Sequence, residues 1–189
     1  SEGMIEAVEY FLSCFPDAEV ILDPIMGDHG RYYTNFDSVY GESMRRLLPY
    51  ASIILPNITE GCLLTGDFYS ENMTQETLLA ICQDLEKFGA KKIVMTSVPC
   101  SFGKKGIVLY ENEQFQLFEK ESLSSEYHGT GDTFDGVFVG AYLNGHTLAE
   151  ALELAHQFVY ACMQESDRYD YEEREGLILS LIHISEPTR

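Results

Sequence analysis

The sequence predicts an α/β fold, a three-layer sandwich with a mostly parallel sheet and helices on both faces. Short runs rich in β-branched residues alternate with amphipathic helical patterns, which is typical of parallel βαβ units. The first two of these runs each stop at a proline, as a buried strand does at its end. The 189 residues, 45% of them hydrophobic, can bury one sizeable core, so a single domain is expected.

The strands follow in chain order. We expect the first in EVILD, residues 19–23, the second within ASIILPN, residues 51–57, and the third in KKIVMTS, residues 91–97. The run GIVLYENEQFQLFE, residues 106–119, predicts a hairpin that adds antiparallel edge strands. Between the first two strands we expect a loop, PIMGDHGRYYTN, punctuated by glycines.

Helices are predicted by apolar spacing and by residues typical of helix ends. The chain opens on such a spacing at Ile5, Val8, Phe11 and Leu12. Capping residues and terminal glycines frame several of the later helices. The later helices are expected over residues 37–48, 59–66, 74–89, 131–143 and 148–166, the second of them capped by Asn57 or Thr59.

Composition excludes several classes of partner. A net charge of −19 argues against a surface that binds nucleic acid or anionic lipid, because such partners need a basic face. Five scattered cysteines without a C-x-x-C pair fit reduced thiols better than disulfides or a zinc site. No apolar run approaches transmembrane length, and no secretory leader opens the chain. We therefore expect a soluble, cytoplasmic protein.

Both ends of the chain are unusual. It starts without an initiator methionine and enters a helical pattern at once, so we expect a cut at the front. The final LSLIHISEPTR, residues 179–189, could be an ordinary polar tail, but it is similar to the in-frame translation of a transposase adapter used in sequencing libraries. We expect this tail to be non-native, so no prediction of fold or function rests on it.

Four polar segments follow predicted strands or open a helix: DPIMGD, LPNITE, TSVP and GTGD. In parallel α/β sheets ligands bind at the carboxyl ends of the strands. We expect the four segments to converge on one rim of the sheet.

The segment GTGD has the most explicit chemistry. Gly129 and Gly131 allow a turn with exposed N–H groups, and a helix N-terminus follows, so with Thr130 they predict an anion hole. Asp132 would then suit a general base for phosphoryl transfer to a hydroxyl. A simple helix cap is an equally good interpretation of Asp132 from composition alone.

The other segments offer carboxylates. Asp23 at a strand end and Asp28 across a glycine-containing loop suit Mg²⁺, although an Asp-Pro turn followed by a solvated Asp is the commoner outcome. Asn57 and Glu60 could hold metal-bound water or phosphate, although alone they are more typical of a capping motif. Neither G-x-x-x-x-G-K-[ST] nor G-x-G-x-x-G is present, so ATP would bind by another architecture.

Taken together, DPIMGD, LPNITEGCLLTG, VMTSVP and YHGTGDTFDGVFVGAYLNGHTLAEALELA resemble the ribokinase-like superfamily, and within it the bacterial type of pyridoxal (vitamin B6) kinase. The resemblance covers nearly all of residues 1–176. It implies an enzyme, a kinase that transfers the ATP γ-phosphate to the 5′-hydroxyl of pyridoxal, pyridoxamine or pyridoxine. Residues 1–178 would form the C-terminal two-thirds of such a kinase domain, incomplete at its N-terminus.

The resemblance also implies roles for single residues. Asp132 would be the catalytic base, with Gly129, Thr130 and Gly131 forming the anion hole. Mg²⁺ would be held by Asp23, Asp28 and Glu60. The residues implied to contact ATP or its phosphates are Asp23, Tyr33, Asn57, Glu60, Thr96, Ser97 and His128.

The resemblance further implies a homodimer and a monovalent cation such as K⁺, although Leu55 stands where relatives often have Thr. Family members begin with a segment that has no counterpart here and that carries part of the vitamin pocket. Two alternatives stay open: a hydroxymethylpyrimidine (phosphate) kinase of thiamine synthesis, and a catalytically inactive nucleotide-binding fragment. The first commonly has Cys where Asp132 stands, which favours the vitamin B6 interpretation.

Overall fold

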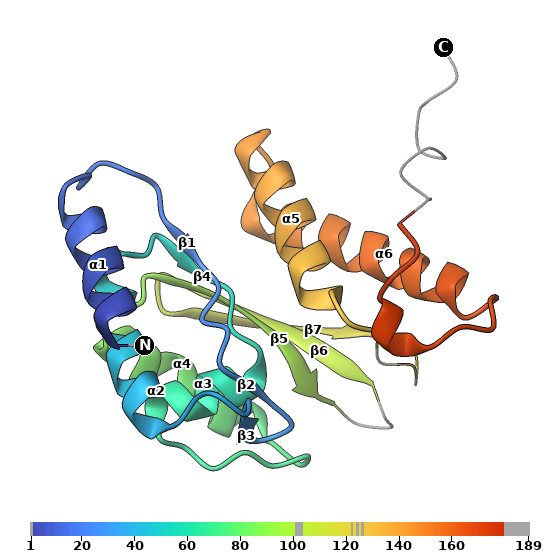
Figure 1. The fold of residues 1–189 in the computed structure, drawn as a ribbon, viewed down its shortest axis with the longest axis horizontal. Coiled ribbons are helices and arrows are strands. Elements are labelled where there is room, and N and C mark those ends of the chain that lie inside the picture. Colours follow the sequence, from blue (N-terminus) through green and yellow to red (C-terminus); the bar gives the residue numbers. More distant parts are fainter. Residues whose placement is uncertain (1, 101–103, 122, 124, 126, 180–189) are drawn as a thin grey trace. The chain divides into compact units, whose positions relative to one another are not determined.

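The computed structural model describes residues 2–100, 104–121, 123, 125 and 127–179. They divide into two compact units, residues 1–120 and the residues from 121 onward (Figure 1). Of the tail expected to be non-native, residues 179–189, all but Leu179 lie outside the described residues. The assignment of residues 1–178 to one kinase domain stays a prediction.

The first unit contains a five-stranded sheet of order β1-β4-β5-β6-β7. β1 pairs with β4 in parallel, with Ile21 opposite Ile53, and β4 pairs with β5 in parallel. β6 and β7 add an antiparallel hairpin, as expected. The α/β class with a mixed sheet is confirmed. The strands are β1 (Ile21–Leu22), β4 (Ile53–Ile54), β5 (Lys92–Pro99), β6 (Lys105–Glu111) and β7 (Gln114–Lys120).

Side-chain caps define three of the helices in this unit. Asp37, Asn57 and Thr74 each accept a hydrogen bond from a backbone N–H of the first turn. The second helix is shorter than expected and ends at Arg45, because Pro49 has no N–H to donate to the Arg45 carbonyl. A 3₁₀ turn, Leu48–Tyr50, follows. The helices are α1 (Glu2–Ser13), α2 (Ser38–Arg45), α3 (Ile58–Thr65) and α4 (Gln75–Lys87).

The N-terminal helix α1 forms where the apolar spacing predicts it, but that spacing does not mark one buried face. Ile5 is buried and Leu12 is half-buried against the core. Val8 and Phe11 remain 38% and 60% exposed. Ile5 and Leu12 therefore pack on the core of the first unit, whereas Val8 and Phe11 face solvent.

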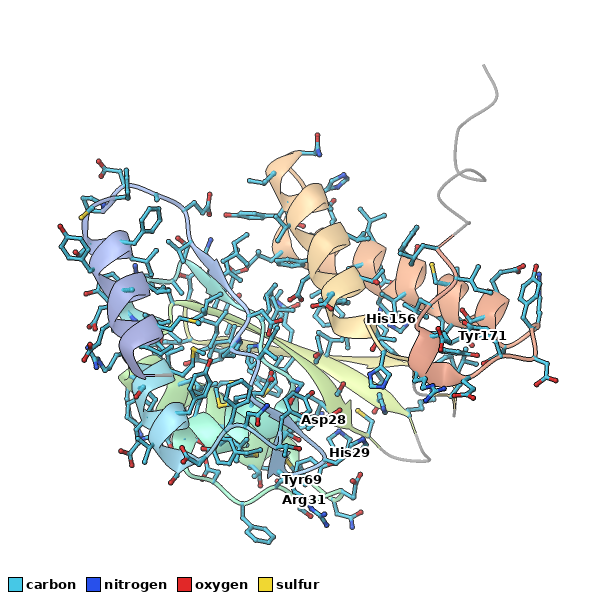
Figure 2. The ribbon with its side chains drawn as sticks, in the orientation of Figure 1. Asp28, His29, Arg31, Tyr69, His156 and Tyr171 are labelled. Carbon is cyan, nitrogen blue, oxygen red and sulfur yellow. The ribbon has the colours of Figure 1, made fainter. Side chains whose placement is uncertain are left out.

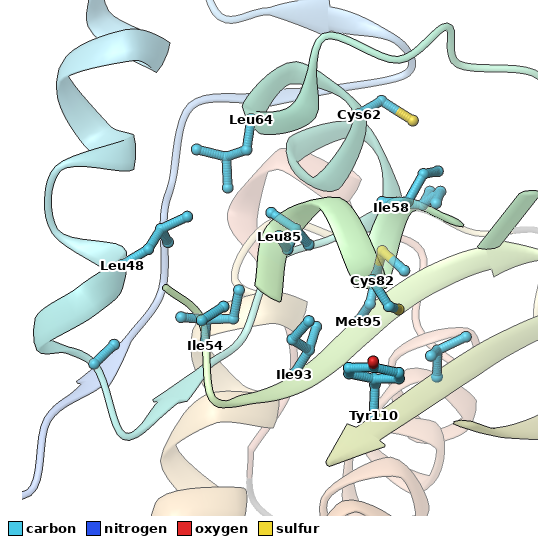
Figure 3. Close-up of a cluster of buried hydrophobic side chains, with 14 of the residues drawn as sticks. Leu48, Ile54, Ile58, Cys62, Leu64, Cys82, Leu85, Ile93, Met95 and Tyr110 are labelled. Atoms are coloured by element: carbon cyan, nitrogen blue, oxygen red, sulfur yellow. The ribbon is translucent and has the colours of Figure 1, made fainter. Parts of the chain in front are cut away.

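One hydrophobic cluster joins the helices of the first unit to its sheet (Figure 3). Ile54 and Ile93 project into it from the parallel strands, and Leu85 from α4 is fully buried beside them. Tyr110 of β6 is also buried, and its hydroxyl donates to Glu86 Oε2 at 2.8 Å. The cluster holds the parallel strands in place, and with them the strand ends.

Shortening one side chain of this cluster is expected to lower the stability of the first unit. Ile93→Ala should lower the free energy of unfolding by about 2–5 kcal/mol, because it removes buried methyl groups and leaves a cavity. Val39→Ala is the matched control, since Val39 is 58% exposed on α2. Urea denaturation followed by circular dichroism measures both. A loss for Ile93→Ala no larger than that of Val39→Ala would contradict the observed packing.

The second unit pairs α5 (Thr130–Leu143) with α6 (Leu148–Ser166). A capping box between Thr147 and Glu150 starts α6 where the sequence predicts it. After α6 the chain returns toward the segment that precedes α5. There the rings of Tyr127 and Tyr171 stack, with 5.8 Å between their centroids. Within the described residues, no helix combines the length and the apolar character needed to span a bilayer.

Candidate functional site

Three of the four predicted polar segments meet at one edge of the sheet in the first unit. Their strands β1, β4 and β5 are parallel, so their carboxyl ends lie at the same edge. The Asn57 side chain donates to the Gly27 carbonyl at 2.9 Å, and Asn57 forms a β-bridge with Thr96. The Thr96 N–H donates to the Pro56 carbonyl at 2.9 Å. The fourth segment, GTGD, lies in the second unit.

Glu60 is the hydrogen-bonding centre of this edge. Only 3% of the residue is exposed, and its two carboxylate oxygens accept from the N–H groups of Met26 at 3.0 Å and Asn57 at 2.9 Å. Asn57 Oδ1 accepts from the Glu60 N–H at 2.9 Å, which completes a capping box on α3. The capping interpretation is therefore confirmed. The bond to Met26 adds a second role, because it ties the DPIMGD loop to the helix.

Burial raises the pKa of the Glu60 carboxyl from 4.5 to about 7. The negative charge of Asp23 raises this pKa further, whereas the backbone N–H groups of Asn57, Met26 and Gly27 lower it. Glu60 therefore titrates near neutral pH. Strongly shifted pKa values of buried groups are frequent at functional sites.

The Tyr33 hydroxyl reports where the carboxylates lie. Its pKa is raised by burial first, and then by the charges of Asp28, Glu60 and Asp23. Charges act on one another over several ångströms, so all three carboxylates lie within electrostatic range of this hydroxyl. Asp28 is exposed, and its Oδ1 accepts from the His29 N–H at 2.7 Å.

The loop expected between the first two strands contains a small hairpin. β2 (Gly27–Asp28) pairs antiparallel with β3 (Arg31–Tyr32). Thr59 of α3 supports it, because its hydroxyl accepts from the Gly30 N–H at 3.0 Å. The turn pair His29-Gly30 is not a typical hairpin signal, and two-residue strands have no detectable periodicity, so the sequence did not indicate this hairpin.

The donor set fits Mg²⁺ only if the nucleotide supplies other ligands. Within the described residues, no group of three His, Cys, Asp or Glu side chains is close enough to hold a metal ion by itself. Mg²⁺ in phosphoryl-transfer sites is usually bound by one or two carboxylates, phosphate oxygens and water. Asp23 and Asp28 match that requirement, whereas both Glu60 oxygens already accept backbone N–H groups.

Thr96 and Ser97 occupy an irregular part of β5. The register between β5 and β6 shifts between Met95 and Val98. Ser97 has a φ of 58°, a left-handed conformation that non-glycine residues rarely adopt, and it is exposed. This irregularity turns the Ser97 side chain out of the regular ladder at the strand's carboxyl end.

In the second unit, GTGD forms the start of α5. Gly129 is the N-cap with a φ of 82°, so the turn requires glycine there. It has no side chain to cap the N–H groups of Thr130, Gly131 and Asp132, which therefore suit an anion. Asp132 is exposed in the first turn and is not the N-cap, which removes the simple cap interpretation. His128 is exposed just before the turn, and Glu126 lies outside the described residues.

Comparisons with known proteins likewise indicate a site for phosphoryl transfer. The profile of the phosphomethylpyrimidine kinase family matches residues 1–176. Pyridoxine kinase of Bacillus subtilis is 28% identical over 149 residues, which are 78% of this chain and 54% of that protein. The chain thus spans about half the length of this curated relative.

Solved structures share the fold. A protein of Bacteroides thetaiotaomicron, named as a candidate phosphomethylpyrimidine kinase and crystallised with pyridoxal, is 33% identical with a TM-score of 0.90. The match covers 100% of this chain and 69% of that one. An ADP complex of Bacillus subtilis pyridoxal kinase is 25% identical with a TM-score of 0.72, and covers 87% of this chain and 62% of its own.

Proposed function

Because the chain belongs to the phosphomethylpyrimidine kinase family, whose profile matches residues 1–176, we propose that the whole protein is a vitamin B6 kinase. It would transfer the γ-phosphate of ATP to the 5′-hydroxyl of pyridoxal, pyridoxamine or pyridoxine in the salvage of pyridoxal phosphate. The observation that carries this proposal is the α5 N-terminus, capped only by Gly129, with Asp132 exposed in its first turn. Relatives crystallised with pyridoxal and with ADP support it.

The second unit supplies the proposed base and anion hole. The Asp132 carboxylate takes the proton of the substrate hydroxyl as its oxygen bonds to the γ-phosphorus. The bond from that phosphorus to the bridging oxygen breaks, and ADP leaves. The N–H groups at residues 130–132 donate to the phosphoryl oxygens, and the positive end of the helix dipole adds to this stabilisation.

The first unit supplies carboxylates for the proposed metal. Asp23 and Asp28 would hold Mg²⁺, and Glu60 would hold the loop that carries them. The ion would neutralise charge on the phosphates of ATP. Direct contact of Glu60 with the metal stays a prediction, as do the ATP contacts of Tyr33, Asn57, Thr96, Ser97 and His128.

The proposal is tested by measuring pyridoxal phosphate formation. The chain, and the same chain extended at its front to the length of its relatives, are incubated with Mg-ATP and pyridoxal. We expect the extended protein to form pyridoxal phosphate with one ADP released for each product. Formation of ADP without pyridoxal phosphate, or of neither, by the folded extended protein would contradict the assignment.

A second candidate is a hydroxymethylpyrimidine (phosphate) kinase, which the description of the matching family favours. The same assay distinguishes the two when hydroxymethylpyrimidine replaces pyridoxal. A larger kcat/KM for hydroxymethylpyrimidine would assign the protein to thiamine synthesis. Nucleotide binding without transfer to either alcohol would favour an inactive nucleotide-binding fragment.

Three other expectations stay predictions. They are a homodimer and a monovalent cation such as K⁺, which the family relationship implies, and a cytoplasmic location, which is expected from the cysteines and the absence of a long apolar run. Leu55 offers no side-chain oxygen to such a cation, and its backbone N–H donates to the Leu22 carbonyl at 2.9 Å.

A further inference from the structure

The hairpin that carries Asp28 needs support from its surroundings. It consists of two residue pairs, with Gly27 opposite Tyr32 and Asp28 opposite Arg31. At its tip, His29 and Gly30 have φ values of 50° and 73°. A two-stranded hairpin is at best marginally stable in water, even with a favourable turn. Its position is therefore set by what it contacts.

One set of contacts comes from the start of α3. The Thr59 hydroxyl accepts from the Gly30 N–H at 3.0 Å, and the Asn57 side chain donates to the Gly27 carbonyl at 2.9 Å. Thr59 is fully buried, so its hydroxyl has a fixed position. These bonds hold the backbone at both ends of the turn.

Another contact comes from Tyr69, in the segment that follows α3. A Cβ atom on Gly30 would lie 2.8 Å from Tyr69 Cδ1 and 3.2 Å from Cγ, so the ring fills the space where a side chain would begin. Figure 2 shows Tyr69 beside Asp28, His29 and Arg31. The preceding residue, Phe68, is 91% exposed. Of two successive aromatic residues, only Tyr69 packs.

The Tyr69 hydroxyl is anchored away from the hairpin backbone. It donates to Glu71 Oε1 at 2.6 Å. Burial, this hydrogen bond and the charges of Glu71 and Asp28 raise the pKa of Tyr69, so the hydroxyl keeps its proton at neutral pH. The ring is therefore held at one end by Glu71 while its edge rests against Gly30.

We propose that Tyr69 is a positioning residue whose ring fixes the Gly27–Tyr32 hairpin, and with it Asp28, for binding of Mg-ATP. The nucleotide part rests on the proposed function, whereas the support of the hairpin does not. Thr59 and Asn57 fix the backbone by hydrogen bonds, and Tyr69 limits its movement by filling the space at Gly30.

Amide hydrogen exchange tests the support directly. The reporters are the N–H groups of Met26, Gly30 and Tyr33, which donate to Glu60, to Thr59 and to the Met26 carbonyl. We expect Tyr69→Ala to speed their exchange by about tenfold, because loss of the ring makes local opening easier. Tyr69→Phe should keep exchange near the original rate, because the ring remains. The matched control Phe68→Ala should also change little.

Exchange in α4 and β5 verifies that each variant keeps its fold. If Tyr69→Ala does not fold, Tyr69→Leu replaces it, with faster exchange in the hairpin again expected. Unchanged hairpin exchange in the folded variant would overturn the proposal. Equal acceleration by Tyr69→Phe would also overturn it, because the hydroxyl rather than the ring would then fix the hairpin.

Binding of Mg-ATP to the extended protein, measured by calorimetry, separates the two proposals. We expect Tyr69→Ala to raise the dissociation constant several-fold, with Tyr69→Phe and Phe68→Ala unchanged. Faster hairpin exchange with an unaltered dissociation constant would overturn the role of Tyr69 in nucleotide binding. If the original protein binds no Mg-ATP, the proposed kinase function fails, and exchange alone decides the support of the hairpin.

Discussion

Asp132→Asn is expected to lower kcat for pyridoxal phosphorylation by about 10²- to 10⁴-fold, the usual contribution of a general base. Asn has nearly the same shape as Asp but does not take up the proton of the attacking hydroxyl. The N–H groups of the α5 N-terminus remain, so the KM for ATP should change little. Steady-state kinetics of the extended protein measures both constants.

The fold should tolerate this change, because Asp132 is exposed. Loss of a negative charge from the first turn of a helix removes about 0.3–1 kcal/mol of stability, which a melting curve can detect. Asp135→Asn is the matched control, since it removes the same charge one turn later on the same helix. Undiminished kcat in Asp132→Asn, or an equal loss in Asp135→Asn, would count against Asp132 as the base.

Helices with clear end signals were the most predictable part of the fold. Thr74 caps α4 as expected, Asn57 rather than Thr59 caps α3, and α6 spans Leu148–Ser166 as its spacing predicts. Each of these ends depends on residues close together in the sequence, which is why the sequence reveals them. β1 and β4 are shorter than their apolar runs, because the length of a strand also depends on its partner.

The parts that sequence did not reveal depend on contacts between distant residues. Nothing in the sequence near Glu60 indicates that the Met26 N–H donates to it, because 34 positions separate the two. The contact of Tyr69 with Gly30 likewise joins two loops. Asn57 and Glu60 were open to two interpretations, a capping motif or a ligand-binding pair. The structure confirms the cap and adds the link to the DPIMGD loop.

Glu60→Gln is expected to alter both the stability of the first unit and its dependence on pH. An amide has one acceptor oxygen where the carboxylate has two, so either the Met26 or the Asn57 N–H loses its acceptor. Leaving a buried donor unsatisfied costs about 1–3 kcal/mol. Urea denaturation at a series of pH values between 5 and 8 measures the change.

The pH dependence follows from the direction of the shift. Because the pKa of Glu60 is raised from 4.5 to about 7, the folded state holds this proton more tightly than the unfolded state. The resulting stabilisation is present in full below pH 4.5 and is lost as pH rises to about 7. A difference of this size corresponds to about 3 kcal/mol. Glu60→Gln should remove this slope, so the variant is less stable at pH 5 and approaches the original protein at pH 8.

Glu6→Gln is the matched control, because Glu6 is an exposed carboxylate on α1 and its replacement should leave the slope in place. Parallel stability curves for Glu60→Gln and the original protein would contradict the raised pKa. At pH 8 Glu60 is ionised, and a buried carboxylate stabilises the fold less than the protonated carboxyl does. Stability alone therefore does not explain why a carboxyl group occupies this position. If Glu60→Gln then equals the original protein in stability but binds Mg-ATP more weakly, the charge serves the nucleotide site rather than the fold.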